Sequence, residues 1–326
     1  MPYPSSDQKD PGSGLAGVTA GQTSICSLGE TLRYRGYAVS DLVQCSFEEV
    51  AYLLLWGELP TAHQLEAFAA RIQRAAQSMP QTIVYCFQRL AESSPKSSIM
   101  DVLRTGVSIL GQLECDNGPA ESLYDRDLSQ QRYKAEQLLG QVPALLTIWI
   151  DCLRGRQPSP WPNKPLTTAL LEKLCRTKVS DIAATVFNTT LILYAEHEFN
   201  ASTFAARTVT STGSDMHSGV TAAIGALKGP LHGGANEKVL HQLMDIGVPE
   251  NIEPWLARKL NDHEVVMGFG HRVYGLRSFT TALLSMLFSV FSEFQVRVFL
   301  FAASRIIHTP KRTLTDTASA LLSSCF

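Results

Sequence analysis

Three histidines lie in sequence settings that suit acid–base chemistry, and the first of them has the most specific surroundings. His232 occupies the stretch Gly-Pro-Leu-His-Gly-Gly-Ala-Asn at 229–236. An apolar helical pattern at 215–227 precedes it, and a second at 237–246 follows it and ends at Gly247, a typical C-cap residue. We therefore expect His232 on a tight turn between two helices, beside a helix start whose free N–H groups suit an anionic oxygen. The alternative is a glycine-rich turn whose histidine only caps a helix.

The second histidine, His197, comes at the end of a strongly apolar helical pattern and is followed by Glu198 and Asn200. The last apolar residues of this pattern, which we expect in the core, are Leu191, Leu193 and Tyr194. The polar cluster is therefore expected to point toward something polar. The alternative is a structural histidine bonded to Glu198 or to a backbone carbonyl. The zinc motif His-Glu-x-x-His is excluded, because residue 201 is alanine.

The third histidine, His271, lies in Met-Gly-Phe-Gly-His-Arg-Val-Tyr at 267–274. The two glycines before His271 and Arg272 allow the backbone to approach a ligand closely. The stretch is not a dinucleotide-binding fingerprint, because Gly-x-Gly-x-x-Gly is absent and no strand pattern precedes it. The chain also contains no Gly-x-Ser-x-Gly, so the glycines beside His232 do not indicate a lipase-type oxyanion hole.

Length and composition define the class of protein that carries these histidines. The length of 326 residues and the composition, 45% hydrophobic and 18% charged, predict a globular protein large enough for two domains. A net charge of -2 without a Lys/Arg run disfavours a nucleic acid or membrane partner. The seven cysteines include no Cys-x-x-Cys pair, which indicates reduced thiols and no metal site. No targeting segment is visible, so a cytoplasmic location is expected, with a mitochondrial one left open.

Most of the chain carries a helical pattern, so we expect an all-α fold. Residues 1–13 are polar and rich in Pro, Ser and Gly, which indicates a disordered lead, and residues 14–42 predict a small hairpin. Ser46 and Glu49 form a capping-box pattern before an apolar helix that Gly57 ends. Further helices are expected at 62–78, 81–92, 100–113, 130–153, 166–176 and 179–194.

Several stretches together resemble the citrate synthase family, and most of all its shorter bacterial-type and 2-methylcitrate synthase branch. They are LRYRGYAVSDL (32–42), FEEVAYLLLWGELPT (47–61), MDVLRTGVS (100–108), residues 196–237 around His197 and His232, and MGFGHRVY (267–274). The resemblance covers about residues 14–274, with the three histidine motifs in the family's order. It implies an all-α homodimer. A large helical domain, residues 14–233, packs against its twin, and a small domain, of which 234–274 form a part, closes over the cleft.

The resemblance also implies the reaction. Oxaloacetate and an acyl-CoA, acetyl or propionyl, condense to citrate or 2-methylcitrate and release CoA, without a further cofactor or metal. His232 resembles the hydrogen-bond donor to the thioester carbonyl oxygen, and His271 the group that polarises the ketone. His197 and Asn200 resemble residues that hold oxaloacetate, and Arg272 a substrate-binding arginine. Three alternatives stay open: a longer acyl chain, a catalytically inactive homologue that dimerises, and an aldol-type lyase.

The family pattern fails after Tyr274. Relatives continue with an Asp-Pro-Arg that binds oxaloacetate and later with the aspartate that removes the α-proton, and neither motif occurs in 275–326. We therefore expect a C-terminally truncated or mis-spliced chain with a hydrophobic tail outside the family and little or no synthase activity. A retained intron and a hydrophobic cap over the cleft are two explanations of this tail. A membrane anchor is disfavoured, because Glu293, Gln295 and Arg297 would be costly in hydrocarbon.

Overall fold

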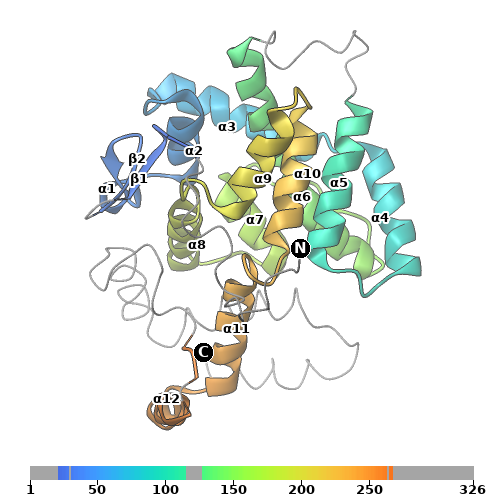
Figure 1. The fold of residues 1–326 in the computed structure, drawn as a ribbon. Coiled ribbons are helices and arrows are strands. Elements are labelled where there is room, and N and C mark those ends of the chain that lie inside the picture. Colours follow the sequence, from blue (N-terminus) through green and yellow to red (C-terminus); the bar gives the residue numbers. More distant parts are fainter. Residues whose placement is uncertain (1–20, 29–30, 115–126, 263, 267–326) are drawn as a thin grey trace, which may run out of the picture.

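The computed structural model describes residues 21–28, 31–114, 127–262 and 264–266, which form a helical body with a small sheet at one edge (Figure 1). The strands form one antiparallel sheet in the order β1-β2-β3: β1 Cys26–Leu28, β2 Leu32–Tyr34 and β3 Tyr37–Ala38. The helices are α1 Val39–Leu42, α2 Phe47–Trp56, α3 Ala62–Gln77, α4 Gln81–Ser93, α5 Ile99–Leu113, α6 Leu128–Leu153, α7 Leu166–Cys175, α8 Asp181–Leu193, α9 Ala201–Thr210, α10 Met216–Leu227, α11 Gly234–Ile246 and α12 Ile252–Asn261, with a 3₁₀ turn at Pro249–Asn251.

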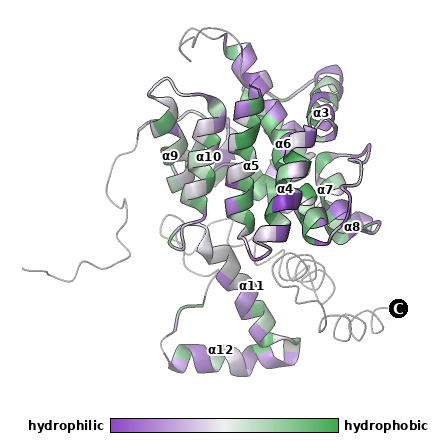
Figure 2. Cartoon of the chain, turned by 90° about the vertical axis from the view of Figure 1, so that its right-hand side faces the viewer, coloured by the Kyte–Doolittle hydropathy of each residue, from purple (hydrophilic) through white to green (hydrophobic). Residues whose placement is uncertain are grey.

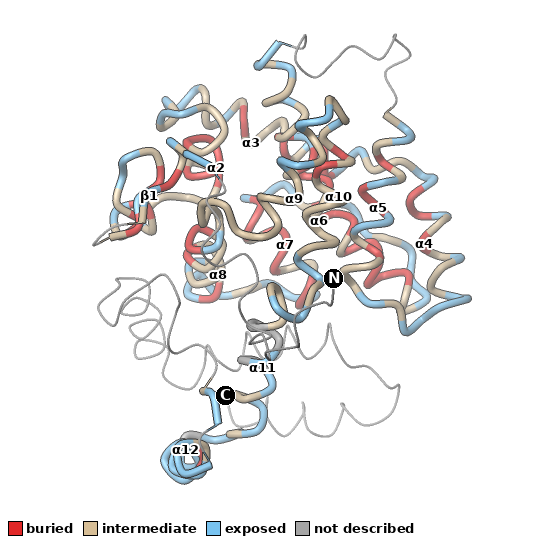
Figure 3. Tube along the Cα trace, in the orientation of Figure 1, coloured by how far each residue is buried: buried red, intermediate tan, exposed pale blue. Residues whose placement is uncertain are grey.

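Helix α6 is the centre of the body, and α3, α4, α5 and α7 pack around it. Its Trp149 is fully buried. Two glycines allow neighbouring helices to approach closely, Gly140 between α6 and α3 and Gly106 between α5 and both α4 and α6. A Cβ at Gly140 would lie 2.2 Å from the carbonyl oxygen of Ile72 on α3, and a Cβ at Gly106 of α5 would lie 2.9 Å from side chains of α4 and α6. Figure 3 shows the buried residues inside this body, whereas α12 is largely exposed.

The small sheet fixes the end of helix α8. Tyr34 of β2 is fully buried, and its hydroxyl lies 3.1 Å from the carbonyl oxygen of Ile192 and 3.2 Å from that of Leu193. These two carbonyls belong to the last turn of α8, where intrahelical N–H partners run out. The sheet therefore holds the point from which the segment with His197 begins.

The predicted fold class and most predicted helices are confirmed. The capping box of Ser46 and Glu49 is present, and Gly57 ends α2 in the left-handed region with φ 97°. The hairpin expected in 14–42 is a three-stranded sheet. Helices α1, α9 and α12 were not predicted. Tyr194 was expected in the core, which is wrong: it is the C-cap residue of α8 and is 58% exposed, because it already lies outside the packed face of the helix.

Helices α11 and α12 extend away from the helical body (Figure 2). Helix α11 begins at Gly234, where the sequence predicted the start of a small domain. The division of the chain into domains remains a prediction. Exposed apolar residues follow one side of α12: Ile252, Leu256 and Leu260. Among the helices of the described part, none combines the length and the apolar character that crossing a bilayer requires.

Candidate active site

His232 lies on the turn that joins α10 to α11, as the sequence predicted. The carbonyl oxygen of Gly229 accepts hydrogen bonds from the backbone N–H groups of His232, at 3.0 Å, and of Gly233, at 3.1 Å. A Cβ at Gly233 would lie only 2.1 Å from the carbonyl oxygen of Leu227. Residue 233 must therefore be glycine because the turn folds back against the end of α10.

The second predicted segment connects α8 to α9 and carries His197, which is half-buried. Glu198 beside it has a φ of 55°, in the left-handed region that a residue with a side chain adopts at a cost. Asn200 is the N-cap residue of α9, and its Oδ1 accepts a hydrogen bond of 3.0 Å from the backbone N–H of Thr203. The side-chain oxygen of Asn200 is thus used as an acceptor in the cap, and the side-chain NH₂ group still has two hydrogens to donate.

A serine that the sequence analysis did not identify joins the two segments. Ser202, in the first turn of α9, lies with its Oγ 2.8 Å from Nε2 of His232. Helix α11 has Gly233 as its N-cap residue, which offers no side-chain cap, and Nε2 of His232 faces Ser202 on α9. The structure therefore brings His232 together with the segment of His197 and Asn200. Ser202 follows Asn200 by two residues, but no local pattern connects it to a turn thirty residues later.

Burial shifts the pKa of two groups next to this segment, Glu196 and Cys26. It raises the pKa of Glu196, whereas the backbone N–H groups of Glu198 and His197 lower it. Burial also raises the pKa of the Cys26 thiol on β1 to about 12, and the negative charge of Glu196 adds to this effect. A thiol of this kind remains protonated at neutral pH, so Cys26 does not suit the role of a nucleophile.

A cation–π contact stabilises the same segment from the side of α9. The guanidinium carbon of Arg207 lies 4.4 Å from the centre of the Phe199 ring. The backbone at Gly21 packs against both groups, since a Cβ there would lie 3.3 Å from the ring and 3.6 Å from the guanidinium. Contacts of this type contribute about 0.5–1 kcal/mol at exposed positions. Phe199 stands between Glu198 and Asn200, so the contact ties this segment to α9.

The remaining predicted site residues, His271 and Arg272, lie outside the described residues. The described part contains no group of three or more His, Cys, Asp and Glu side chains arranged to hold a metal ion. The structure thus places His232, His197 and Asn200 on neighbouring segments, and the roles of all five predicted site residues remain predictions.

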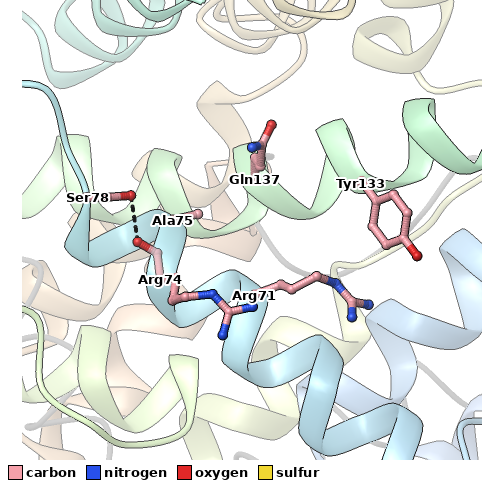
Figure 4. A pocket seen from close by; sticks show the side chains of 6 residues that line it. All are labelled: Arg71, Arg74, Ala75, Ser78, Tyr133 and Gln137. Atoms are coloured by element: carbon pink, nitrogen blue, oxygen red, sulfur yellow. Dashed lines mark hydrogen bonds between the residues drawn. The ribbon is translucent and has the colours of Figure 1, made fainter.

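A hollow of about 280 Å³ lies on other elements, between α3 and α6 (Figure 4). It is lined by Arg71, Arg74, Ala75, Ser78, Tyr133 and Gln137. Arg71 contacts the buried carboxylate of Glu136 through its Nε at 2.5 Å and through a second nitrogen at 3.2 Å, so its charge is already compensated. The histidine segments contribute no residue to this hollow, and the chemistry is therefore expected at the turn of His232.

Comparison with known proteins places this arrangement in a family. The family model described as "Citrate synthase, C-terminal domain" matches residues 14–293, which extends past Tyr274 into the predicted tail. The chain is 43% identical over 281 residues to a 2-methylcitrate synthase of Mycobacterium tuberculosis, covering 84% of this chain and 68% of the relative. It is 45% identical over 269 residues to a citrate synthase of Mycolicibacterium smegmatis, covering 80% and 68%.

A solved structure has the same overall arrangement. It is the ternary complex of a citrate synthase from Thermoplasma acidophilum with carboxymethyl coenzyme A and oxaloacetate. Its TM-score is 0.74 and its sequence identity 26%, with 96% of this chain and 80% of that chain covered.

Proposed function

This chain belongs to the citrate synthase family, whose members condense oxaloacetate with an acyl-CoA, and we propose that the contact between Ser202 and His232 marks its catalytic centre. The reaction makes a carbon–carbon bond between the α-carbon of the thioester and the ketone carbon of oxaloacetate. A proton leaves the α-carbon, the ketone oxygen gains one, and water then cleaves the thioester to release CoA. The 2.8 Å contact supports the proposal, because it joins the two predicted substrate-binding segments at one point.

His232 is the hydrogen-bond donor to the thioester carbonyl oxygen. A neutral imidazole carries one N–H, and the other ring nitrogen accepts. When the hydroxyl of Ser202 donates to Nε2, the proton of His232 is held at Nδ1. Nδ1 then presents an N–H to the oxygen on which negative charge develops as the enol forms, and stabilisation of such charge is a large part of catalysis. Ser202 thus selects the tautomer that the reaction needs.

His197 and Asn200 hold oxaloacetate. The cap leaves the amide nitrogen of Asn200 as a donor for a substrate oxygen. His271 polarises the ketone and Arg272 binds a carboxylate, since a guanidinium suits the two oxygens of that group. The chain requires no metal or further cofactor for these steps, which are proton transfers and one carbon–carbon bond formation.

The acyl group is acetyl or propionyl. The relatives support both, because a 2-methylcitrate synthase at 43% identity and a citrate synthase at 45% identity are about equally similar to this chain. One methylene changes binding by only about 1–3 kcal/mol, so a preference rests on few contacts. The partner in the assembly is a second copy of the chain, as the family resemblance implies.

Release of CoA, measured with acetyl-, propionyl- and hexanoyl-CoA in the presence of oxaloacetate, tests the proposal. We expect little or no turnover from the 326-residue chain, so the variants are compared in a form whose C-terminal segment restores turnover. In that form His232→Ala is expected to lower turnover by a factor of about 10²–10⁴, whereas the exposed His63→Ala changes nothing. Calorimetric titration with oxaloacetate is expected to show weaker binding to His197→Ala. A wild-type chain that neither releases CoA nor binds oxaloacetate would favour the inactive homologue instead. Sedimentation of the same protein tests the homodimer.

A further inference from the structure

The stretch Met-Asp-Val-Leu-Arg-Thr, at 100–105, has no role in the site described above, although it carries part of the family resemblance. It forms the first turns of α5, which lies beside α10 (Figure 2) and runs in the opposite direction, as the contacts at the two ends of the pair show. At one end of the pair, Gly111 of α5 packs so closely on His217 of α10 that a Cβ would lie 2.8 Å from the histidine Cβ. At the other end, Nζ of Lys228 lies 2.8 Å and 2.7 Å from the two carboxylate oxygens of Asp101.

We propose that Asp101 and Lys228 are positioning residues for His232, an inference that rests on the proposed function. Their ion pair fixes the C-terminal end of α10 to the N-terminal end of α5. The turn with His232 starts at the next residue, so its direction depends on this fixed end.

Hydrogen bonds and a close backbone contact fix the chain between Lys228 and His232, so the position of Lys228 determines that of His232. Lys228 is the C-cap residue of α10, and its N–H is bonded to the helix. Gly229 follows directly, and its carbonyl oxygen accepts from the N–H groups of His232 and Gly233. Gly233 in turn lies against the carbonyl of Leu227, where no Cβ fits. Ser202 on α9 binds Nε2 of the imidazole, and Asp101 on α5 holds the helix end from which the turn begins. His232 is therefore positioned by residues of two helices.

The charges suit the helix ends at which they stand. Asp101 lies in the first turn of α5, where the helix dipole favours a negative charge, and Lys228 lies at the C-terminal end of α10, where a positive charge is favoured. The side chains of Asp101 and Lys228 are 32% and 44% exposed, so the pair adds little to global stability. Its effect is on orientation, and small displacements of a catalytic group are costly for a reaction.

Arg104 provides a matched control, because it binds the same carboxylate and forms no hydrogen bond with the described residues 229–233 of the turn. Its guanidinium nitrogen lies 3.0 Å from Oδ1 of Asp101. Arg104→Gln therefore removes one positive charge from Asp101 and leaves the contact with Lys228. Asp101→Asn and Lys228→Gln remove the ion pair with little change of shape, and Asp101→Glu retains it.

Amide hydrogen exchange of the full chain tests the proposal without requiring turnover. We expect Asp101→Asn and Lys228→Gln to speed exchange at the His232 and Gly233 amides by up to about fivefold, the factor that an exposed ion pair contributes. Exchange along 216–226 of α10 stays as in the wild type, and so does exchange at the turn in Asp101→Glu and Arg104→Gln. The imidazole ¹⁵N spectrum is the second readout. The resonances of His232, assigned by their loss in His232→Gln, shift in the two disrupting variants.

Four results would overturn the proposal. One is unchanged exchange at the turn in Asp101→Asn, and another is an equal effect of Arg104→Gln. The third is faster exchange along the whole of α10, which would mean that the pair only stabilises the helix. The fourth is an unshifted imidazole in a variant whose turn exchanges faster. A wild-type chain that neither releases CoA nor binds oxaloacetate would refute the proposed function alone, because neither readout depends on turnover or on substrate binding.

Discussion

His217 provides a test of the packing between α5 and α10 through the dependence of stability on pH. Its side chain is 7% exposed and faces charged groups on three elements. Nε2 lies 3.7 Å from a carboxylate oxygen of Glu114 at the end of α5, and Nδ1 lies 3.8 Å from Asp215, the N-cap residue of α10. Lys134 of α6 binds the same Glu114. Nε2 has no hydrogen-bond partner among the described residues.

Burial lowers the pKa of His217, and the positive charge of Lys134 lowers it further, although Glu114 and Asp215 act in the opposite direction. The native state thus holds a neutral imidazole at a pH where the unfolded chain, with a pKa of about 6.5, already binds a proton. Above that pH neither state is protonated and stability is unaffected. As the pH falls below 6.5, the free energy of unfolding decreases by up to about 1.4 kcal/mol per pH unit until the native pKa is reached.

His217→Gln removes the proton-binding group and keeps a polar side chain of similar size. We expect urea unfolding between pH 8 and pH 5 to show a smaller loss of stability for this variant than for the wild type, by up to about 1.4 kcal/mol for each unit below 6.5. The exposed His63→Gln provides the control and follows the wild-type curve. Burial raises the pKa of Glu114, but its contacts with Lys134, Gln141 and His217 together outweigh burial and the net pKa is lowered, so this carboxylate changes stability only at lower pH.

The result that would refute this reasoning is a pH dependence that is the same in His217→Gln and the wild type. It would mean that the pKa of this imidazole is the same in the native and unfolded states, so that the carboxylates of Glu114 and Asp215 fully offset burial. A steeper loss in the variant would mean that the carboxylates outweigh burial and that the native imidazole binds its proton more tightly than the unfolded chain does.

Three further predictions concern the site and the core. Ser202→Ala should lower turnover about tenfold with an unchanged KM for oxaloacetate, since it removes one hydrogen bond from His232; an unchanged kcat would contradict this. Gly140→Ala should lower the free energy of unfolding by at least about 1–3 kcal/mol, because its Cβ would meet a backbone oxygen of α3; urea unfolding at wild-type stability would show that the helices separate without cost. Arg71→Ala should destabilise more than Glu136→Ala, because it leaves a carboxylate that is 1% exposed without its cation, whereas the arginine is 30% exposed; equal losses in urea unfolding would contradict this.

Local signals in the sequence were sufficient for most of the helices and their ends. The capping box of Ser46 and Glu49 closes within four residues, and Gly57 ends the same helix by its own backbone preference. Such interactions depend only on residues close in the chain. Tyr194 shows where this reasoning stops, because an apolar residue at a helix end is exposed or buried according to what packs beside it.

The side chains that position His232 make contacts between residues far apart in the sequence, which no local pattern shows. Ser202 reaches His232 across thirty residues, and Asp101 reaches Lys228 across 127. The resemblance identified His232 as the donor and left Ser202 and Asp101 without a role. A motif names the group that reacts, whereas the tertiary fold determines which side chains orient it.

The residues that hold His232 in place all belong to the helical body. Ser202 lies on α9, Asp101 on α5, and the backbone anchor at Leu227 belongs to α10. Helix α11 starts two residues after His232 and extends away from the body (Figure 1). A change in the direction of α11 is therefore absorbed after Gly233, and the imidazole keeps its place against α9. His232, the proposed donor to the thioester, thus belongs to the helical body and not to α11.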